Sequence, residues 1–213
     1  MDIRFISPSE THEWLLMKHY AKRIPCITDA FGLYHKGVLV GVCTFGIPAS
    51  RQLCVGVCGE EYADSVRELN RLCIDDEARE LKKNVASYFV GACLRRIRKP
   101  NETVIVVSYA DTEMGHIGKV YQATNFLFTG TTKERTDIST GEGKHSRHYD
   151  KTIDYSLNRK KRSAKHRYVF FAGHGKNLKE CSKSLKYPIL PYPLGETKRY
   201  DASYRVETQL SLF

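Results

Sequence analysis

A strand–helix–strand unit in the middle of the chain constrains the fold more than any other feature. Residues 65–74 alternate as a strand, and residues 103–111 (TVIVVSYAD) form a strongly apolar strand. Between them, residues 78–98 have the spacing of a long helix with one buried stripe. The stripe consists of apolar residues four positions apart, namely Leu81, Val85, Phe89, Cys93 and Ile97. Because a sheet and a one-sided helix must cover each other, the unit predicts a layered α/β core.

Further strands and helices surround this unit. The apolar patterns predict strands at 2–6, 30–35, 38–46, 125–131 and 166–173, and helices at 10–23, 115–124 and 176–186. Their alternation predicts an α/β (α+β) fold, with a mixed central sheet and helices on both faces. We expect one domain over residues 1–186. Residues 187–213 are expected to form an extended tail, because three prolines between residues 187 and 200 prevent regular structure.

Basic residues gather in the second half of the chain. The net charge is +10, yet residues 1–143 hold 18 basic and 18 acidic side chains. Residues 144–167 hold nine basic and two acidic side chains, and residues 168–213 hold seven and four. A neutral front joined to a basic rear indicates a body with a surface for a polyanion, and nucleic acid is favoured over a membrane. An ordinary solvated surface loop is the alternative.

The sequence disfavours several classes of protein. No apolar run reaches the ~18 residues that a membrane helix needs, and the first residues lack the pattern of a signal peptide. The seven cysteines are scattered through apolar stretches, which is typical of buried thiols in a reduced cytoplasm. Cys54 and Cys58 have no second Cys/His pair at zinc-finger spacing, so we do not expect structural zinc.

The start of the long helix offers a candidate phosphate site. Free N–H groups and the helix dipole favour an anion there, beside Lys82, Lys83, Asn84 and Ser87. We assign Arg71, on the preceding strand, to the same cofactor-binding group. The sequence has no Walker loop and no GxGxxG motif, and an ordinary charged first turn is the alternative.

A second cluster lies where the strand 103–111 ends. Ser108, Tyr109 and Asp111 are followed closely by His116, so a hydroxyl, a phenol, a carboxylate and an imidazole gather at a strand-to-helix turn. Ligands bind at such strand ends in sheets of this kind. A plain helix-capping role for Asp111 is the alternative. The pair His19–Tyr20, on the first predicted helix, is a weaker candidate by itself.

The order of strands and helices matches the GNAT acyltransferases, which bind acyl-coenzyme A with the pyrophosphate at the helix start after the fourth strand. The glycine-rich loop of that family is replaced here by ELKKNVAS. A narrower match accounts for the departure, because residues 14–193 resemble the phage Mom DNA-modification family, a divergent GNAT-like group. The segments that carry the resemblance are HYAKRIP (19–25), ELNRLCI (68–74), KNVAS (83–87), VSYADTEMGHIGKVYQATNFLFTG (107–130), KHRYVFFAG (165–173) and LKYPILPYP (185–193).

The resemblance implies an enzyme that places a carbamoylmethyl group on the exocyclic amine of adenine in DNA and so protects phage DNA from restriction. It implies acetyl-CoA or a related acyl-CoA as cofactor and double-stranded DNA as partner. It also implies the cytoplasm of an infected or lysogenic host bacterium as the location. The catalytic residues that we assign on this basis are His19, Tyr20, Ser108, Tyr109 and Asp111, with Ser87 nearby.

The chemistry of adenine makes its own demands on the site. The amine lone pair is delocalised into the ring and the base is stacked inside the duplex, so the base must flip out. Tyr20 or Tyr109 is expected to stack on it, and Asp111 to accept the amine proton or orient the ring. Because a carbamoylmethyl group is joined through its methylene carbon, ordinary acyl transfer does not produce it. A redox metal such as iron, held by His19, Tyr20 and Asp111, is one solution.

The basic segment 144–167 is expected to grip DNA. The phosphate contacts are assigned to Arg147, Arg159, Lys160, Lys161, Arg162, Lys165 and Arg167, with His148, Tyr149 and Tyr155 interleaved. Such contacts predict salt-sensitive binding with little sequence preference. The last residues, QLSLF (209–213), are similar to the pentapeptide that binds the bacterial sliding clamp, and an ordinary tail is the alternative.

Two rival functions stand beside this one. The first is a plain acetyl-CoA-dependent acetyltransferase that acts on a protein or a small amine. The second is a DNA-binding anti-restriction protein without catalytic activity. Only the adenine-modifying enzyme predicts a modified deoxyadenosine in DNA.

Overall fold

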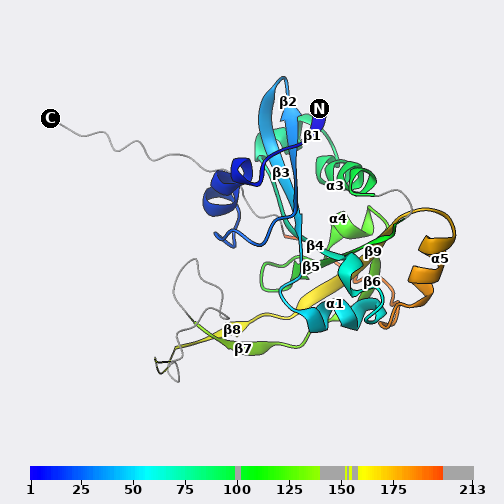
Figure 1. Ribbon diagram of the computed structural model, residues 1–213. Coiled ribbons are helices and arrows are strands. Elements are labelled where there is room, and N and C mark those ends of the chain that lie inside the picture. The colour runs from blue at the N-terminus through cyan, green and yellow to red at the C-terminus, as the bar shows by residue number, and fades with distance from the viewer. Residues whose placement is uncertain (99–101, 140–151, 153, 155–157, 199–213) are drawn as a thin grey trace.

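A mixed seven-stranded sheet organises the protein (Figure 1), and the computed structural model describes residues 1–98, 102–139, 152, 154 and 158–198. The strands are β1 (Asp2–Phe5), β2 (Asp29–His35), β3 (Val38–Gly46), β4 (Val66–Ile74), β5 (Val104–Asp111), β6 (Leu127–Thr131) and β9 (Lys165–Ala172). They lie in the order β1-β2-β3-β4-β5-β9-β6. Strands β4 and β5 pair in parallel, and the other neighbours are antiparallel. The predicted mixed sheet is confirmed.

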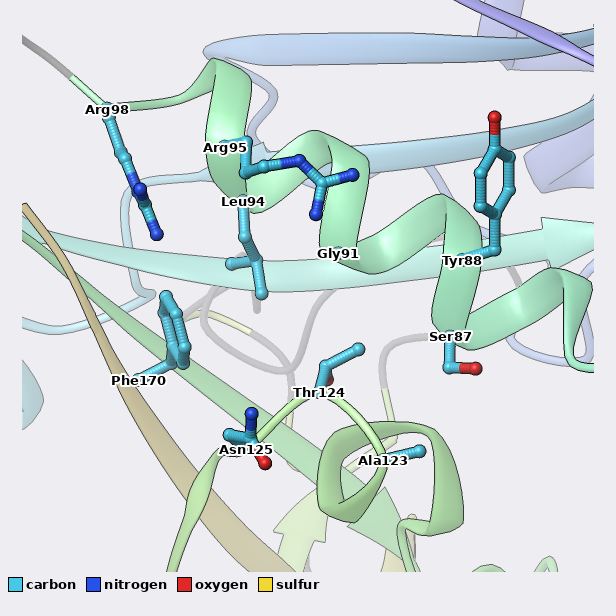
Figure 2. A pocket seen from close by; sticks show the side chains of 10 residues that line it. All are labelled: Ser87, Tyr88, Gly91, Leu94, Arg95, Arg98, Ala123, Thr124, Asn125 and Phe170. Carbon is cyan, nitrogen blue, oxygen red and sulfur yellow. The ribbon is translucent and has the colours of Figure 1, made fainter.

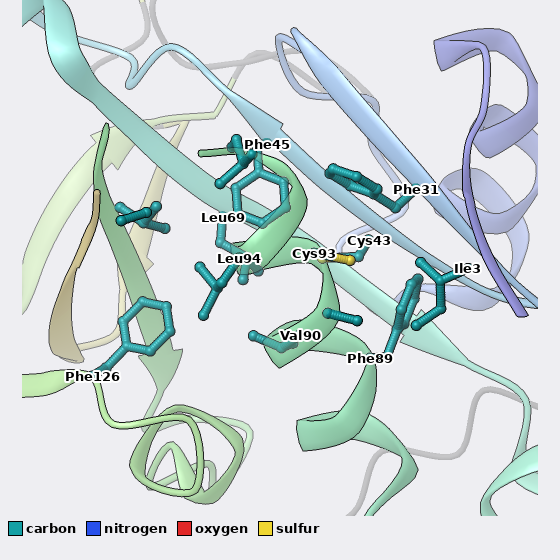
Figure 3. Packing of buried hydrophobic residues seen from close by; sticks show 14 of the residues in the cluster. Ile3, Phe31, Cys43, Phe45, Leu69, Phe89, Val90, Cys93, Leu94 and Phe126 are labelled. Atoms are coloured by element: carbon teal, nitrogen blue, oxygen red, sulfur yellow. The ribbon is translucent and has the colours of Figure 1, made fainter. Parts of the chain in front are cut away.

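Helices cover both faces of the sheet, as predicted. On one face, α3 (Val85–Arg96) packs over the largest apolar cluster, which includes Phe31, Phe45 and Phe126 (Figure 3). On the other face, α1 (Arg51–Cys58) and α5 (Gly175–Lys183) cover a second cluster. The short α4 (Lys119–Gln122) follows β5. Helix α1, which Ser50 caps by accepting from the Leu53 N–H at 3.3 Å, was not predicted.

The long helix predicted over 78–98 is divided into two helices. α2 (Asp76–Leu81) ends before α3 begins, and Asn84 between them has a left-handed backbone with φ 58°. An L-residue in that conformation interrupts the helical hydrogen bonds. The stripe from Val85 to Ile97 is buried as predicted, whereas Leu81 is 61% exposed because it belongs to the separate α2.

The first predicted helix, 10–23, is also shorter. It consists of the 3-10 turn η1 (Pro8–Thr11) and the π-helical turn η2 (Trp14–Lys18), and the backbone is extended at His19. Trp14 and Leu15 pack against Val42 of β3, on the sheet face opposite α3. The pair His19–Tyr20 therefore lies in the turn after η2 rather than on a helix.

Two further segments depart from the expected pattern. Strands β7 (Arg135–Ile138) and β8 (Arg159–Arg162) form a separate hairpin that extends away from the body (Figure 1). Residues 187–198 are extended as expected, but they pack on the domain. The Leu190 N–H donates to the Phe128 carbonyl at 2.9 Å, and the Lys198 N–H donates to the Gly115 carbonyl at 3.0 Å.

Some of the predicted DNA contacts and the predicted clamp-binding segment cannot be compared with the structure. Arg147, His148, Tyr149, Tyr155 and the QLSLF segment lie outside the described residues. None of the described helices combines the length and apolarity that crossing a bilayer requires. All seven cysteines are free thiols, and all but Cys26 are buried.

Candidate active site

Strands β4 and β5 separate partway along their length. Only Val66–Glu68 pairs with Ile105–Val107, although β4 continues to Ile74 and β5 to Asp111. At the point of separation, the Ser108 hydroxyl donates to the Leu69 carbonyl at 2.9 Å. We call this point the β4–β5 divergence. Because the two backbones no longer bond each other beyond it, side chains from both strands can face a ligand there.

A bulge in β4 aims Arg71 at the site. Thr44 of β3 is paired with Arg71 and Phe45 with Leu69, which leaves Asn70 as an extra residue. The extra residue reverses the alternation of faces, so Leu69 joins the core under α3 while Arg71 lies on the opposite face. The Asn70 side chain accepts from the Thr44 hydroxyl at 2.6 Å and donates to the Cys26 carbonyl at 2.9 Å. The bulge therefore ties the loop before β2 to the sheet.

That loop presents His19 and Tyr20. Their rings stack with centroids 4.4 Å apart, and Tyr20 meets His116 edge-on at 6.0 Å. The Ala21 N–H donates to Nδ1 of His19 at 3.1 Å, which leaves the imidazole proton on Nε2. Burial, with Arg71 and His116 nearby, lowers the pKa of His19 to about 3. His19 is thus a neutral hydrogen-bond donor near pH 7.

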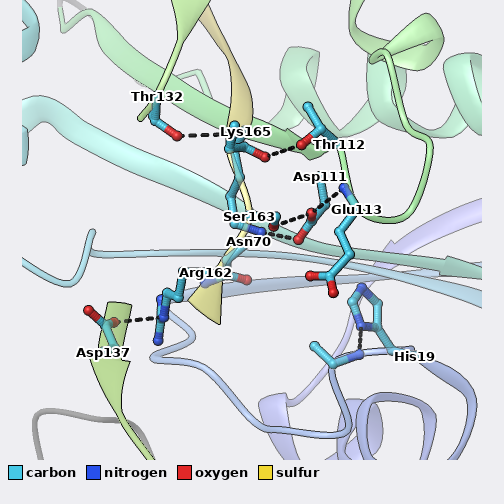
Figure 4. A network of polar contacts seen from close by, with 12 residues as sticks. His19, Asn70, Asp111, Thr112, Glu113, Thr132, Asp137, Arg162, Ser163 and Lys165 are labelled. Carbon is cyan, nitrogen blue, oxygen red and sulfur yellow. Dashed lines mark hydrogen bonds and ion pairs between the residues drawn. The ribbon is translucent and has the colours of Figure 1, made fainter. Parts of the chain in front are cut away.

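Asp111 is the centre of a polar network (Figure 4). It accepts from the Ser163 hydroxyl at 2.5 Å, from the Glu113 N–H at 3.1 Å and from the Lys165 ammonium. Burial opposes ionisation of this carboxyl, but the hydrogen bonds from Lys165 and Ser163 outweigh it and lower the Asp111 pKa. Both carboxylate oxygens are engaged, so of the two roles predicted for Asp111 this geometry favours orienting the ring over accepting the amine proton.

Glu68 is a site residue that sequence reasoning missed. It is half-buried at the β4–β5 divergence, and its carboxylate forms no hydrogen bond or ion pair with any described residue. Burial raises its pKa, although Arg71, Lys165 and Arg23 oppose the shift. Burial also raises the pKa of the neighbouring Tyr109 phenol, and the Glu68 charge adds to that effect. The sequence carries little signal for it, because the same strand also has other polar residues, namely Arg67, Asn70 and Arg71.

Two hydroxyl groups meet on the other side of the divergence. Ser108 is fully buried, and Tyr121 of α4 packs against Phe126 and Tyr168 with centroids 5.3 Å away in each case. Burial raises the pKa of Tyr121, although a hydrogen bond with Ser108 opposes the shift. Because the Ser108 hydroxyl also donates to a backbone carbonyl, it serves here as a bridge rather than a nucleophile. Tyr121 was not predicted.

The residues predicted to bind the cofactor phosphates lie in two separate places in the fold. Lys82, Lys83, Asn84 and Ser87 lie between α2 and the first turn of α3, as expected. The Lys82 ammonium stands 3.3 Å from the centroid of the Tyr88 ring, and the Ser87 hydroxyl donates to the Asn84 carbonyl at 3.0 Å. Arg71 is separated from them, because it lies beside His19 on the opposite face of the sheet.

A groove of about 350 Å³ lies along α3 (Figure 2). It runs from Ser87 in the first turn to Arg98, and the turn after α4 forms its other wall. Its lining combines the guanidinium groups of Arg95 and Arg98 with the aromatic ring of Phe170 and the amide of Asn125. Sequence reasoning did not single out this groove, because its residues come from three separate segments.

The described part of the basic segment divides into two groups. Arg159, Lys160 and Lys161 are exposed on β8, where Lys161 pairs with Glu134 at 2.7 Å and Arg162 pairs with Asp137 at 2.7 Å. Lys165 and Arg167 belong to β9 instead. Lys165 binds Asp111, and Arg167 donates to the Thr129 hydroxyl at 2.9 Å. These two side chains are partly exposed and already contact other residues of the domain, and their phosphate contacts stay a prediction.

The expected metal ligands do not come together as a set. Among the described residues, no group of three or more His, Cys, Asp or Glu side chains is placed to hold a metal ion. Nδ1 of His19 accepts a backbone N–H, and both oxygens of Asp111 are occupied by Lys165 and Ser163. The residues therefore do not fit the iron site that was one solution considered for His19, Tyr20 and Asp111.

Comparison with known proteins identifies the family. The methylcarbamoylase mom of Escherichia phage Mu is 30% identical over 132 residues, which cover 60% of this chain and 53% of that protein, about half of its length. Among solved structures, an acetyltransferase-like protein (yncA) from Salmonella typhimurium with its cofactor acetyl-CoA gives a TM-score of 0.49 at 10% identity. It covers 82% of this chain and 95% of that one. An N-acetyltransferase from Staphylococcus aureus Mu50 gives 0.46 at 15% identity over 79% and 96%. The model of the Mom protein family matches residues 1–194, and the chain belongs to that family.

Proposed function

We propose that this protein is a DNA-modifying transferase that places a carbamoylmethyl group on the exocyclic amine of adenine. Membership of the Mom family and the similarity to the methylcarbamoylase of phage Mu support this assignment. The observation that carries it is the β4–β5 divergence, where a carboxylate without a partner among the described residues, Glu68, lies near the neutral His19–Tyr20 pair. A flipped base needs an aromatic surface and a proton acceptor side by side, and this cluster supplies both.

We assign the proton transfer to Glu68. Bond formation at the adenine amine releases a proton, and an acceptor with a raised pKa near the operating pH takes it up efficiently. Burial raises the pKa of Glu68 and so makes it a better proton acceptor than an ordinary glutamate, whereas Asp111 has a lowered pKa and is occupied by Lys165. His19 cannot substitute for Glu68, since Nδ1 already accepts a hydrogen bond. Its Nε2–H is available as a donor to a ring nitrogen of the base, while Tyr20 stacks on the ring.

The groove along α3 is the proposed site of an acyl-CoA. Arg95 and Arg98 would pair with its phosphates, and Phe170 offers a face for an adenine ring. The first turn of α3, with Lys83 exposed beside it, adds N–H donors for the pyrophosphate. The groove and the His19–Tyr20 pair lie on opposite faces of the sheet, so cofactor and base would approach the divergence from different sides.

The β7–β8 hairpin is the proposed contact with double-stranded DNA. Arg159, Lys160 and Lys161 are exposed along β8, and Arg162 at its end is close enough to Arg23 of the His19 loop to lower the Arg23 pKa, although burial contributes more. A cationic strand next to the base pocket would hold the backbone while one nucleotide is turned inward.

Nucleoside analysis tests this function. DNA from bacteria that express the full chain is digested and its nucleosides are weighed by mass spectrometry. We expect a deoxyadenosine that is heavier by one carbamoylmethyl group, and DNA that resists restriction. Unmodified nucleosides together with an acetylated small amine would instead show a plain acetyltransferase. Restriction resistance without any modified nucleoside would show a protein that only binds DNA.

A further inference from the structure

Arg71 is a buried cation whose hydrogen-bonding capacity is only partly used. The residue is only 9% exposed, and its Nε has no hydrogen-bond partner among the described residues. Nη1 donates to the Asn70 carbonyl at 2.6 Å, and Nη2 makes a long contact of 3.4 Å to the Arg23 carbonyl. A guanidinium has five donors and no acceptor, and burying one without a partner is unfavourable.

Two other cations of the same region have carboxylate partners. Lys18 binds Asp75 at 2.6 Å. Arg79 lies 3.7 Å from Asp76, and its Nε donates to the Ile74 carbonyl at 3.2 Å. No described carboxylate forms such an ion pair with Arg71, although Glu68 is near enough to influence its charge. Arg71 therefore differs from Lys18 and Arg79, each of which has a carboxylate partner.

Among the charged groups around Arg71, the cation Arg23 has a larger effect on its pKa than the Glu68 carboxylate. Arg23 is close enough for the two guanidinium groups to repel each other, and its backbone carbonyl is the acceptor for Nη2 of Arg71. The β4 bulge fixes this arrangement, because Asn70 holds the Arg23 loop through the Cys26 carbonyl. Two neighbouring cations held by backbone contacts form a site that is stabilised when an anion binds between them.

The free edge of Arg71 indicates the shape of that anion. Nε and Nη2 lie on the same edge of the planar guanidinium, and they match the two oxygens of a carboxylate in a bidentate pair. DNA phosphates remain on the backbone outside a base pocket, whereas Arg71 is nine-tenths buried beside His19. We propose that Arg71 and Arg23 form a receptor for the carboxylate of a small molecule that binds next to the His19–Tyr20 pair. The proposal rests on the proposed function and deepens it, since such a molecule would bind beside the residues that are proposed to hold the base.

A nuclear magnetic resonance titration of the full chain tests the receptor directly. The protein is labelled with ¹⁵N-arginine, and the Nε–H signal of Arg71 is assigned by its loss in Arg71→Lys. Acetate is the carboxylate probe, inorganic phosphate is the second oxyanion, and chloride controls for ionic strength. We expect acetate to shift the Arg71 signal in a saturable way, while the Arg79 signal stays in place because its Nε already has a partner.

Each outcome decides the proposal. A saturable acetate shift, weakened about tenfold or more in Arg23→Gln, supports the carboxylate receptor. A shift with phosphate alone, an equal shift with chloride, or no shift with any anion overturns it. The reading does not depend on DNA modification. If nucleosides are unmodified while acetate still binds Arg71, the proposed function fails and the receptor stands. If the nucleosides are modified while acetate does not bind Arg71, the proposed function stands and the receptor fails.

Discussion

The charged cluster at the β4–β5 divergence and the β7–β8 hairpin use the same residue types in opposite environments. The side chains of Lys165 and Asp111 are 31% and 10% exposed, whereas those of Lys161 and Glu134 are 73% and 54% exposed. Water screens the exposed pair and leaves its net contribution small, while a buried pair becomes costly once one partner is removed. The comparison teaches that the interior charges fix geometry, and that the hairpin charges are available to an external polyanion.

Removing the cation from the interior pair should have the largest effect on stability. Lys165→Met leaves the Asp111 carboxylate buried without its main partner, so we expect a loss of about 3 kcal/mol in the free energy of unfolding. Urea denaturation measures the loss. The double variant Lys165→Met with Asp111→Leu should recover much of it, since no uncompensated charge remains. A loss below about 0.5 kcal/mol in the single variant would mean that the Lys165–Asp111 pair contributes no more to stability than an exposed ion pair, which would contradict the prediction.

The buried imidazole should give the next largest effect, as a dependence of stability on pH. His19 has a folded pKa of about 3, below the ordinary value of about 6.5 for an unfolded histidine. Below pH 6.5 the unfolded chain therefore binds a proton that the folded chain refuses, and stability falls as the pH falls toward 3. Between pH 7 and pH 5 this loss is about 2 kcal/mol.

Substitution of this histidine isolates its contribution. Between pH 7 and pH 5, the free energy of unfolding of His19→Gln should fall by about 2 kcal/mol less than that of the unaltered protein. Equal slopes for the two proteins would mean that the imidazole titrates normally and is not desolvated.

At the base of the hairpin, Arg162 is an intermediate case. Its side chain is 29% exposed and that of its partner Asp137 is 20% exposed. We expect Arg162→Gln to lower the free energy of unfolding by about 1 kcal/mol, less than the interior lysine and more than an exposed pair. Thermal unfolding of the two hairpin variants, Arg162→Gln and Lys161→Gln, gives the ranking. A larger loss for Lys161→Gln would reverse the inferred order of burial.

The exposed hairpin cations should affect DNA binding and leave stability nearly unchanged. We expect Lys160→Gln and Lys161→Gln to change the free energy of unfolding by less than about 0.5 kcal/mol. Each should lower the slope of log affinity against log salt by about one, because one phosphate contact is lost. Fluorescence anisotropy with duplex DNA at several salt concentrations measures the slope. An unchanged slope in both variants would remove the hairpin from the DNA surface.

The sequence predicted most of the strands and the stripe of α3, because those elements carry strong apolar periods. It mispredicted what depends on single backbone choices. The left-handed Asn84 divides a helix whose apolar period runs on without interruption, and the early end of η2 moves His19 and Tyr20 into a turn. Ala21 and Lys22 hold that turn through backbone hydrogen bonds, which leave no pattern in the sequence.

The candidate site was predicted in part for the same reason. His19, Tyr20, Tyr109 and Asp111 were singled out from local chemistry and from the family resemblance. The fold brings Tyr20 close to His19 and to Asp111, and it places Tyr109 beside Glu68. The roles of Asp111 and Arg71 depend on partners distant in the sequence. Lys165, which lies 54 residues away in the sequence, binds the Asp111 carboxylate. A one-residue bulge in β4 turns Arg71 to the sheet face opposite α3. Glu68 was missed because only the separation of β4 from β5 distinguishes it from an ordinary strand residue.

The central claim is that Glu68 at the β4–β5 divergence accepts the proton when adenine is modified. The most direct measurement is the amount of modified deoxyadenosine in DNA from cells that express Glu68→Gln, with Glu180→Gln on α5 as the matched control at equal protein levels. We expect Glu68→Gln to lower the modified nucleoside about a hundredfold or more and Glu180→Gln to match the unaltered protein. Equal modification by Glu68→Gln and the unaltered protein would contradict the claim.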